Sequence, residues 1–137
     1  METYDIVFKG YRREEKVSSM PEYSGIYLAY RCAYNKANRT VSLRELIYIG
    51  QAQNLRTRLL QHKNDGDLDK ELKDGEQICY AYAKVDADKL DIVENALIFA
   101  QQPRINTNLK QSFDHRAAKF IVEGDCALLE YKDFEIS

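Results

Sequence analysis

The sequence lacks the features of membrane, secreted and disulfide-framework proteins. Its apolar runs are short: the run Ala96–Ala100 falls far below the roughly 20 residues that a membrane-spanning helix needs. Residues 1–16 alternate charged and apolar side chains, whereas a signal peptide requires a continuous apolar core. The cysteines, Cys32, Cys79 and Cys126, are odd in number and 47 positions apart, which fits neither a disulfide framework nor a metal-knuckle spacing. We therefore expect a cytoplasmic protein whose cysteines are small core or surface residues.

The sequence also lacks a segment that would divide it into domains. It contains no repeat, no low-complexity stretch and no Gly/Ser-rich or Pro-rich linker, and its prolines, Pro21 and Pro103, lie at expected element boundaries. With 45% hydrophobic and 31% charged residues, a chain of 137 residues can bury roughly two-thirds of the surface that it exposes when unfolded. We therefore predict one continuous domain over residues 1–137.

The chain has no excess of positive charge. Its 20 Lys and Arg against 22 Asp and Glu give a net charge of −2, whereas proteins that hold nucleic acid through phosphate contacts are usually basic. The charge is uneven, because residues 44–63 and 104–119 each carry four basic residues and one acid, while residues 64–94 carry ten acids and four lysines. Such blocks are commonly solvated faces, but this distribution permits a polyanion-binding surface.

Hydrophobic periodicity predicts a mixture of strands and helices. Expected strands lie at residues 4–8, 25–31, 46–50 and 77–85, and expected helices lie at 55–63 and 88–101. Residues 25–31 and 46–50 should form an antiparallel hairpin with a long connection over residues 31–44, for which the sequence offers no function. The tail predicts a second hairpin from residues 117–122 and 127–131.

Alternation along the two hairpin strands places each of two tyrosines among small residues. Tyr27 should share its face with Gly25 and Ala29, and Tyr48 should share its face with Leu46 and Gly50. Space is therefore left around both rings. Strand tyrosines are more commonly packing residues than site residues, and this chain has ten tyrosines.

The first predicted helix, which begins after the N-cap Asn54, presents two polar side chains together. Helical spacing places Arg58 and His62 on one flank of the apolar stripe, and it turns Arg56 to the other side. An Arg and a His four positions apart are commonly only an exposed pair. The two arginines are nevertheless not equivalent.

Glu94 lies among apolar residues of the second predicted helix. It projects between Leu90, Leu97 and Ile98, while Asn95 is expected on the wet side of the helix. A carboxylate that is partly removed from water takes up a proton or finds a cation. Glu94 is thus either a boundary residue paired with a Lys or Arg, or a ligand of a hydrated Mg²⁺.

The order of these elements along the chain resembles the GIY-YIG nuclease superfamily. The matching segments are Gly25-Ile26-Tyr27, Tyr48-Ile49-Gly50, the helix Asn54 to His62, Glu94-Asn95 in the second helix, and Pro103-Arg104-Ile105-Asn106. The resemblance covers residues 21–108, with residues 1–20 and 109–137 as flanking extensions.

The resemblance implies an α+β fold with a three-stranded antiparallel sheet flanked by helices, to which a short N-terminal strand and a C-terminal hairpin are added. It implies an endonuclease that hydrolyses DNA phosphodiester bonds with one Mg²⁺ or Mn²⁺ ion. The catalytic residues that it implies are Tyr27, Tyr48, Arg58, His62 and Asn106, with Glu94 as the metal ligand.

These residue types suit phosphodiester hydrolysis. Arg58 neutralises a phosphate with a fixed fork of donors, and the resemblance implies that Tyr27 takes the proton of the attacking water. A tyrosine of ordinary pKa, about 10, needs nearby positive charge for this role. Tyr48 and His62 are alternative bases, and the sequence leaves the choice among the three open.

Six further basic residues are candidate nucleic-acid contacts: Arg56, Lys63, Arg104, Lys110, Arg116 and Lys119. Lysines found near the second tripeptide in some members of the superfamily are replaced here by Gln51 and Gln53, which predicts weaker phosphate affinity. The short flanks offer no separate DNA-reading domain, so sequence specificity is expected to be low or to come from a homodimer or a protein partner. Branched, damaged or foreign duplexes, as met in DNA repair or restriction, are the expected substrates, with RNA as an alternative.

A function from another class fits the same sequence. A binding module could retain the nuclease fold and hold DNA or a protein partner without cutting. The retention of Glu94 favours the enzyme, because a binding module does not need a metal-ligating carboxylate.

Overall fold

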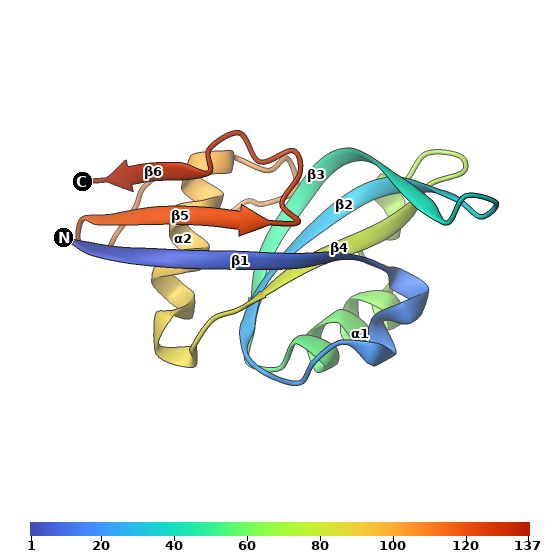
Figure 1. Ribbon diagram of the computed structural model, residues 1–137, viewed down its shortest axis with the longest axis horizontal. Helices are drawn as coiled ribbons and strands as arrows, with labels where there is room; N and C mark the ends of the chain where they lie inside the picture. The colour runs from blue at the N-terminus through green and yellow to red at the C-terminus, as the bar shows by residue number, and fades with distance from the viewer.

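The computed structural model describes residues 1–137 and has an α+β fold built on one six-stranded sheet (Figure 1). The strands are β1 (Glu2–Arg13), β2 (Gly25–Asn35), β3 (Thr40–Ala52), β4 (Gln77–Lys84), β5 (Ala118–Gly124) and β6 (Asp133–Ile136). They lie in the order β3-β2-β4-β1-β5-β6, in which β1 and β5 are parallel and all other neighbours are antiparallel. The chain reverses direction at nearly every step across the sheet.

Two α-helices and three short 3-10 helices accompany the sheet. The α-helices are α1 (Leu55–Asp65) and α2 (Leu90–Gln101), and the 3-10 helices are η1 (Glu14–Ser19), η2 (Asp69–Glu71) and η3 (Ala87–Lys89). Both predicted helices are confirmed, although η3 takes up the start predicted for the second. The side chain of Asn54 caps α1 by accepting a hydrogen bond from the backbone N–H of Thr57, at 3.1 Å. None of the helices is long and apolar enough to cross a membrane.

The predicted bounds of several strands are wrong. β2 and β3 extend far beyond residues 25–31 and 46–50, so only residues 36–39 connect them and the long connection predicted at 31–44 does not exist. β1 is also longer than predicted, because its backbone pairs with β4 and β5. The terminal hairpin is present, but its second strand is β6 and not residues 127–131.

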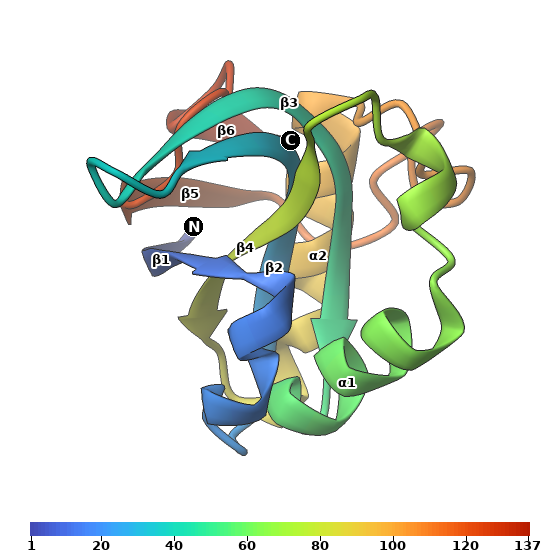
Figure 2. The same ribbon diagram turned by 90° about the vertical axis from the view of Figure 1, so that its right-hand side faces the viewer.

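The central strands separate two hydrophobic clusters. Along β2, Ile26, Leu28 and Tyr30 pack with the apolar face of α2, whereas Tyr27 and Ala29 pack with α1 and η1. This alternation is what a strand covered on both faces requires. Figure 2 shows α1 in front, beside η1, and α2 behind β2 and β3. The two helices therefore approach β3, the edge strand of the sheet, from opposite sides.

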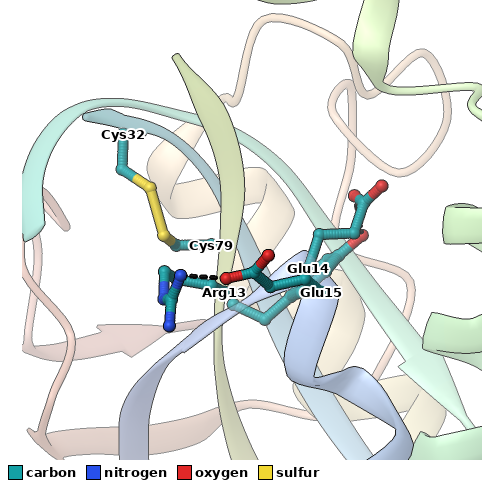
Figure 3. The surroundings of a disulfide bond; sticks show 6 residues. Arg13, Glu14, Glu15, Cys32 and Cys79 are labelled. Atoms are coloured by element: carbon teal, nitrogen blue, oxygen red, sulfur yellow. Dashed lines mark hydrogen bonds and ion pairs between the residues drawn. A yellow bond between two sulfur atoms is a disulfide. The ribbon is translucent and has the colours of Figure 1, made fainter. Parts of the chain in front are cut away.

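Two of the cysteines form a disulfide, which corrects the sequence prediction. Cys32 of β2 and Cys79 of β4 are fully buried and bonded, with their Cα atoms 6.2 Å apart (Figure 3). Their separation along the chain hides a close approach, because antiparallel pairing sets Tyr30 opposite Cys79 and Cys32 is the next residue on the same face. Cys126 is free and buried, as the prediction allowed. The disulfide thus joins the neighbouring strands β2 and β4.

Candidate active site

Tyr27 and His62 are in direct contact. The Tyr27 hydroxyl lies 2.8 Å from His62 Nε2, and His62 Nδ1 lies 2.9 Å from both carboxylate oxygens of Asp67. Tyr27 is 1% exposed and His62 is 3% exposed, whereas the Asp67 side chain is half-exposed. β2 supplies the tyrosine, the last turn of α1 supplies the histidine, and the loop after α1 supplies the aspartate. These three side chains form a continuous hydrogen-bonded row from the sheet to the surface.

Small residues make room for the two tyrosine rings, as predicted. Tyr27 stands opposite Gly50 in the β2–β3 ladder, and Tyr48 stands opposite Ala29. The Tyr27 ring crosses directly over Gly50, because a side chain on that glycine would overlap the phenol. One detail is wrong: a register shift after Ala29 turns Leu46 to the α2 face, away from Tyr48.

Arg58 lies beside the hydroxyl groups of both tyrosines. Burial raises the pKa of Tyr27 and of Tyr48 above the ordinary tyrosine value, and the positive charge of Arg58 opposes this shift without overcoming it. The positive charge that the base role of Tyr27 requires is therefore present, but it does not bring the pKa of Tyr27 below the ordinary tyrosine value. Both phenols stay protonated near neutral pH, so either one can act as a base only by passing its own proton to a neighbour.

His62 is the neighbour that can take this proton. Burial lowers the pKa of His62, and the Asp67 carboxylate opposes the shift by accepting its hydrogen bond. The imidazole is thus neutral near neutral pH and has one nitrogen free to accept a proton. Among the three bases that the sequence left open, the geometry favours Tyr27 backed by His62.

Glu94 projects from α2 at the end of β3. Burial raises the pKa of Glu94, and a hydrogen bond from Gln51 opposes the shift. The Gln51 side-chain amide donates to Glu94 Oε1 at 2.8 Å and to Asp91 Oδ1 at 2.9 Å. No lysine or arginine pairs with Glu94, which disfavours its interpretation as a boundary ion pair. The backbone N–H of Gln51 also acts on this carboxylate and lowers its pKa further.

A pocket of about 170 Å³ lies where β3, α2 and the segment after α2 meet. Its lining includes Tyr48, Glu94 and Asn106, so it brings together three residues predicted for the site. Glu94 is near enough to Tyr27 and Tyr48 for its charge to raise the pKa of each. No group of three or more His, Cys, Asp or Glu residues is arranged to hold a metal ion, so any cation here would depend on Glu94 and on water or substrate oxygens.

Asn106 binds the backbone of β3 through both polar atoms of its side-chain amide. Its side-chain oxygen accepts from the backbone N–H of Ile49, and its side-chain nitrogen donates to the carbonyl oxygen of the same residue, both at 2.9 Å. Asn106 is 6% exposed. Its amide therefore fixes the edge of β3 between Tyr48 and Gly50 and holds the site in place. These contacts suit a residue that positions the site, and a catalytic role for Asn106 stays a prediction.

Asn95, expected on the wet side of α2, is buried. Its side chain donates to the carbonyl oxygens of Leu109 and Ser112 and accepts from the backbone N–H of Asp114. The helix face that periodicity marked as polar is thus covered by the segment that follows α2.

Most of the predicted nucleic-acid contacts already have partners. Arg56 pairs with Glu22, Arg104 with Glu45 and Glu71, Arg116 with Glu2, and Lys119 with Asp133, while Lys110 donates to the carbonyl oxygen of Pro103. Lys63 has no ion pair. Arg58 has none either and bonds weakly to Gln61 at 3.3 Å. The cation best placed to meet a phosphate at the site is therefore Arg58.

Comparison with protein-family models, with curated proteins and with solved structures gives no match.

Sequence reasoning missed the two residues that complete this arrangement. Asp67 lies in a loop and forms no periodic pattern with α1, so only the structure shows it against His62. The sequence identifies Gln51 only as a neutral residue, and no pattern in it predicts the contacts of Gln51 with Asp91 and Glu94. Asp65, Asp67 and Asp69 all follow His62 closely in the sequence, so the sequence offers Asp67 only as one of several candidate partners of the imidazole.

Proposed function

We propose that this chain is a metal-dependent endonuclease of the GIY-YIG type that hydrolyses DNA phosphodiester bonds. The observation that carries the proposal is the hydrogen bond between Tyr27 and His62 beside an unpaired Arg58, with the partly buried carboxylate of Glu94 nearby. A water-activating group, a phosphate-binding cation and a metal-ligating anion are what this hydrolysis needs. The resemblance of residues 21–108 to the superfamily adds support.

The residues at Glu94 fit a hydrated divalent cation. Gln51 orients the carboxylate with neutral N–H donors, no lysine or arginine pairs with it, and the adjoining pocket has room for water and for phosphate oxygens. Mg²⁺ or Mn²⁺ held there would supply Lewis-acid charge to the scissile phosphate and would stabilise the leaving 3′ oxygen. The neutral amide of Gln51 orients the carboxylate without competing with a cation for its charge.

The protein's own residues account for the remaining steps. Arg58 offers two parallel donors to a nonbridging phosphate oxygen pair and stays charged at every pH of interest. Arg58 lies beside the Tyr27 hydroxyl, so a phosphate held by the guanidinium would bring the reacting water next to this phenol. Tyr27 takes a proton from this water while its own proton passes to His62 Nε2.

Purified protein incubated with supercoiled plasmid at low salt, in Mg²⁺ and separately in Mn²⁺, tests the proposal. We expect the plasmid to be converted to nicked or linear DNA, and we expect no conversion when EDTA is added or when the Glu94→Gln variant is used. Cleavage that survives undiminished in Glu94→Gln would refute the metal assignment. A salt-sensitive gel shift without any cleavage would instead support a binding module.

Two arginines on α1 provide a matched pair of variants. Arg56 donates to the carbonyl oxygen of Met20 and pairs with Glu22, on the side away from the tyrosines, whereas Arg58 lies beside their hydroxyls. Arg58→Ala should therefore lower the cleavage rate far more than Arg56→Ala. The reverse ranking would contradict the placement of the phosphate.

A further inference from the structure

The row of hydrogen bonds at the site does not end at His62. Asp67 presents both carboxylate oxygens to His62 Nδ1, each at 2.9 Å, and makes no other hydrogen bond within the protein. Its neighbour Asp65 also acts on His62, but only through its charge. The loop that carries Asp67 begins at Gly66, whose left-handed backbone ends α1 directly after its last turn. The chain therefore turns back so that Asp67 meets the outer edge of the buried imidazole.

We propose that Asp67 is a positioning residue that fixes the tautomer of His62. A carboxylate can only accept hydrogen bonds, so the hydrogen of the neutral imidazole is held on Nδ1. Nε2 then carries the lone pair and faces the Tyr27 hydroxyl, which becomes the donor in their shared hydrogen bond. With the opposite tautomer, Nε2 would donate to Tyr27 and could not accept its proton.

This inference rests on the proposed endonuclease function and specifies how its proton is handled. Water loses one proton to the Tyr27 oxygen and its hydroxide bonds to phosphorus, while the bond from phosphorus to the leaving oxygen breaks. The Tyr27 proton moves to His62 Nε2, and the imidazolium so formed is stabilised by the Asp67 carboxylate. The leaving oxygen takes a proton from solvent water, and His62 releases its extra proton to solvent. The sum is one water consumed and one phosphodiester bond broken.

Two measurements test the role of Asp67, and only one depends on cleavage. Nitrogen-15 NMR of the His62 ring in the full chain without DNA reports which nitrogen carries the hydrogen. We expect the Nδ1-protonated form in the natural protein and a mixture of tautomers in Asp67→Ala. In plasmid cleavage with Mg²⁺, Asp67→Ala should lower kcat by about 10- to 100-fold with little change in KM, as loss of a charge-assisted hydrogen bond predicts.

Asp65→Ala is the matched control, because it removes a nearby negative charge without removing a hydrogen bond. It should leave the tautomer unchanged and change kcat by less than threefold. An Nε2-protonated His62 in the natural protein would overturn the inference, and so would equal kcat values for Asp67→Ala and Asp65→Ala. If the natural protein cuts no DNA, the proposed function fails, but the tautomer measurement still decides whether Asp67 positions His62. Urea unfolding of both variants, whose substituted residues are surface-accessible, verifies that each is folded.

Discussion

Replacement of Asn106 by alanine separates a positioning role from a catalytic one. The side chain of Asn106 satisfies both the N–H and the C=O of Ile49. Ile49 is fully buried and lies in β3, which is an edge strand because only β2 pairs with it. With alanine at position 106, neither group has a partner within the protein, and each is left in a site with little access to water.

The cost can be worked out from these two bonds. A buried backbone group that loses its partner costs about 1–3 kcal/mol, and water that enters the space vacated by the amide recovers part of this. We expect Asn106→Ala to lower the free energy of unfolding by about 2–4 kcal/mol. At a urea dependence of about 2 kcal/mol per molar, the unfolding midpoint should fall by about 1–2 M.

Urea unfolding and plasmid cleavage together provide the assay. Asn108→Ala is the control, because Asn108 lines the same pocket, is exposed and makes no hydrogen bond within the protein. If Asn106 only positions β3, the cleavage rate of Asn106→Ala and its free energy of unfolding should fall together. A variant with the natural unfolding midpoint and more than 100-fold slower cleavage would refute this reasoning and return Asn106 to the reacting groups.

Three further predictions concern the packing around the site. Gly50→Ala should abolish cleavage and destabilise the fold, since its new methyl group would displace the Tyr27 ring; natural activity in this variant would contradict the observed contact. Reduction of the Cys32–Cys79 disulfide should lower the free energy of unfolding by roughly 4 kcal/mol, as loop-closure entropy predicts, and unchanged urea unfolding in dithiothreitol would rule this out. Burial raises the pKa of Glu14 to about 7, so stability falls as pH rises from the ordinary glutamate pKa to 7. Because this carboxylate is partly exposed and screened, Glu14→Gln should stabilise the protein by only about 1–2 kcal/mol at pH 8 and by almost nothing at pH 4.5; equal effects at the two pH values would exclude the shift.

Local sequence patterns predicted the elements better than their ends. Alternation identified β2, β3 and β4, and capping by Asn54 with helical spacing identified α1. The ends of strands depend on which partners continue to pair, and this is decided across the sheet. β1 illustrates the limit, because a short apolar alternation at residues 4–8 became a strand from Glu2 to Arg13 once β4 and β5 paired with it.

The residues of the candidate site show the same difference between local and long-range relations. Tyr27 and Tyr48 could be placed from alternation, and Arg58 with His62 from helical phase, because each relation spans only a few residues. The disulfide could not be predicted, because the approach of its two cysteines exists only after β2 and β4 pair over a separation of 47 positions. Spacing of cysteines along a chain is informative for short metal loops and carries no information about opposed strands.

The charges at the site explain why a cation belongs in the proposed mechanism. Glu94 and Asp67 are carboxylates, and Arg58 is the only basic residue beside the tyrosines. Gln51 and Asn106 fill the adjacent positions with neutral amides, so they orient Glu94 and the edge of β3 without adding positive charge. A phosphate that binds at the site adds negative charge. The single guanidinium of Arg58 cannot balance both this phosphate and the partly buried carboxylate of Glu94. A divalent cation at Glu94 would restore the balance, and the neutral side chains of Gln51 and Gln53 add no positive charge that could replace it.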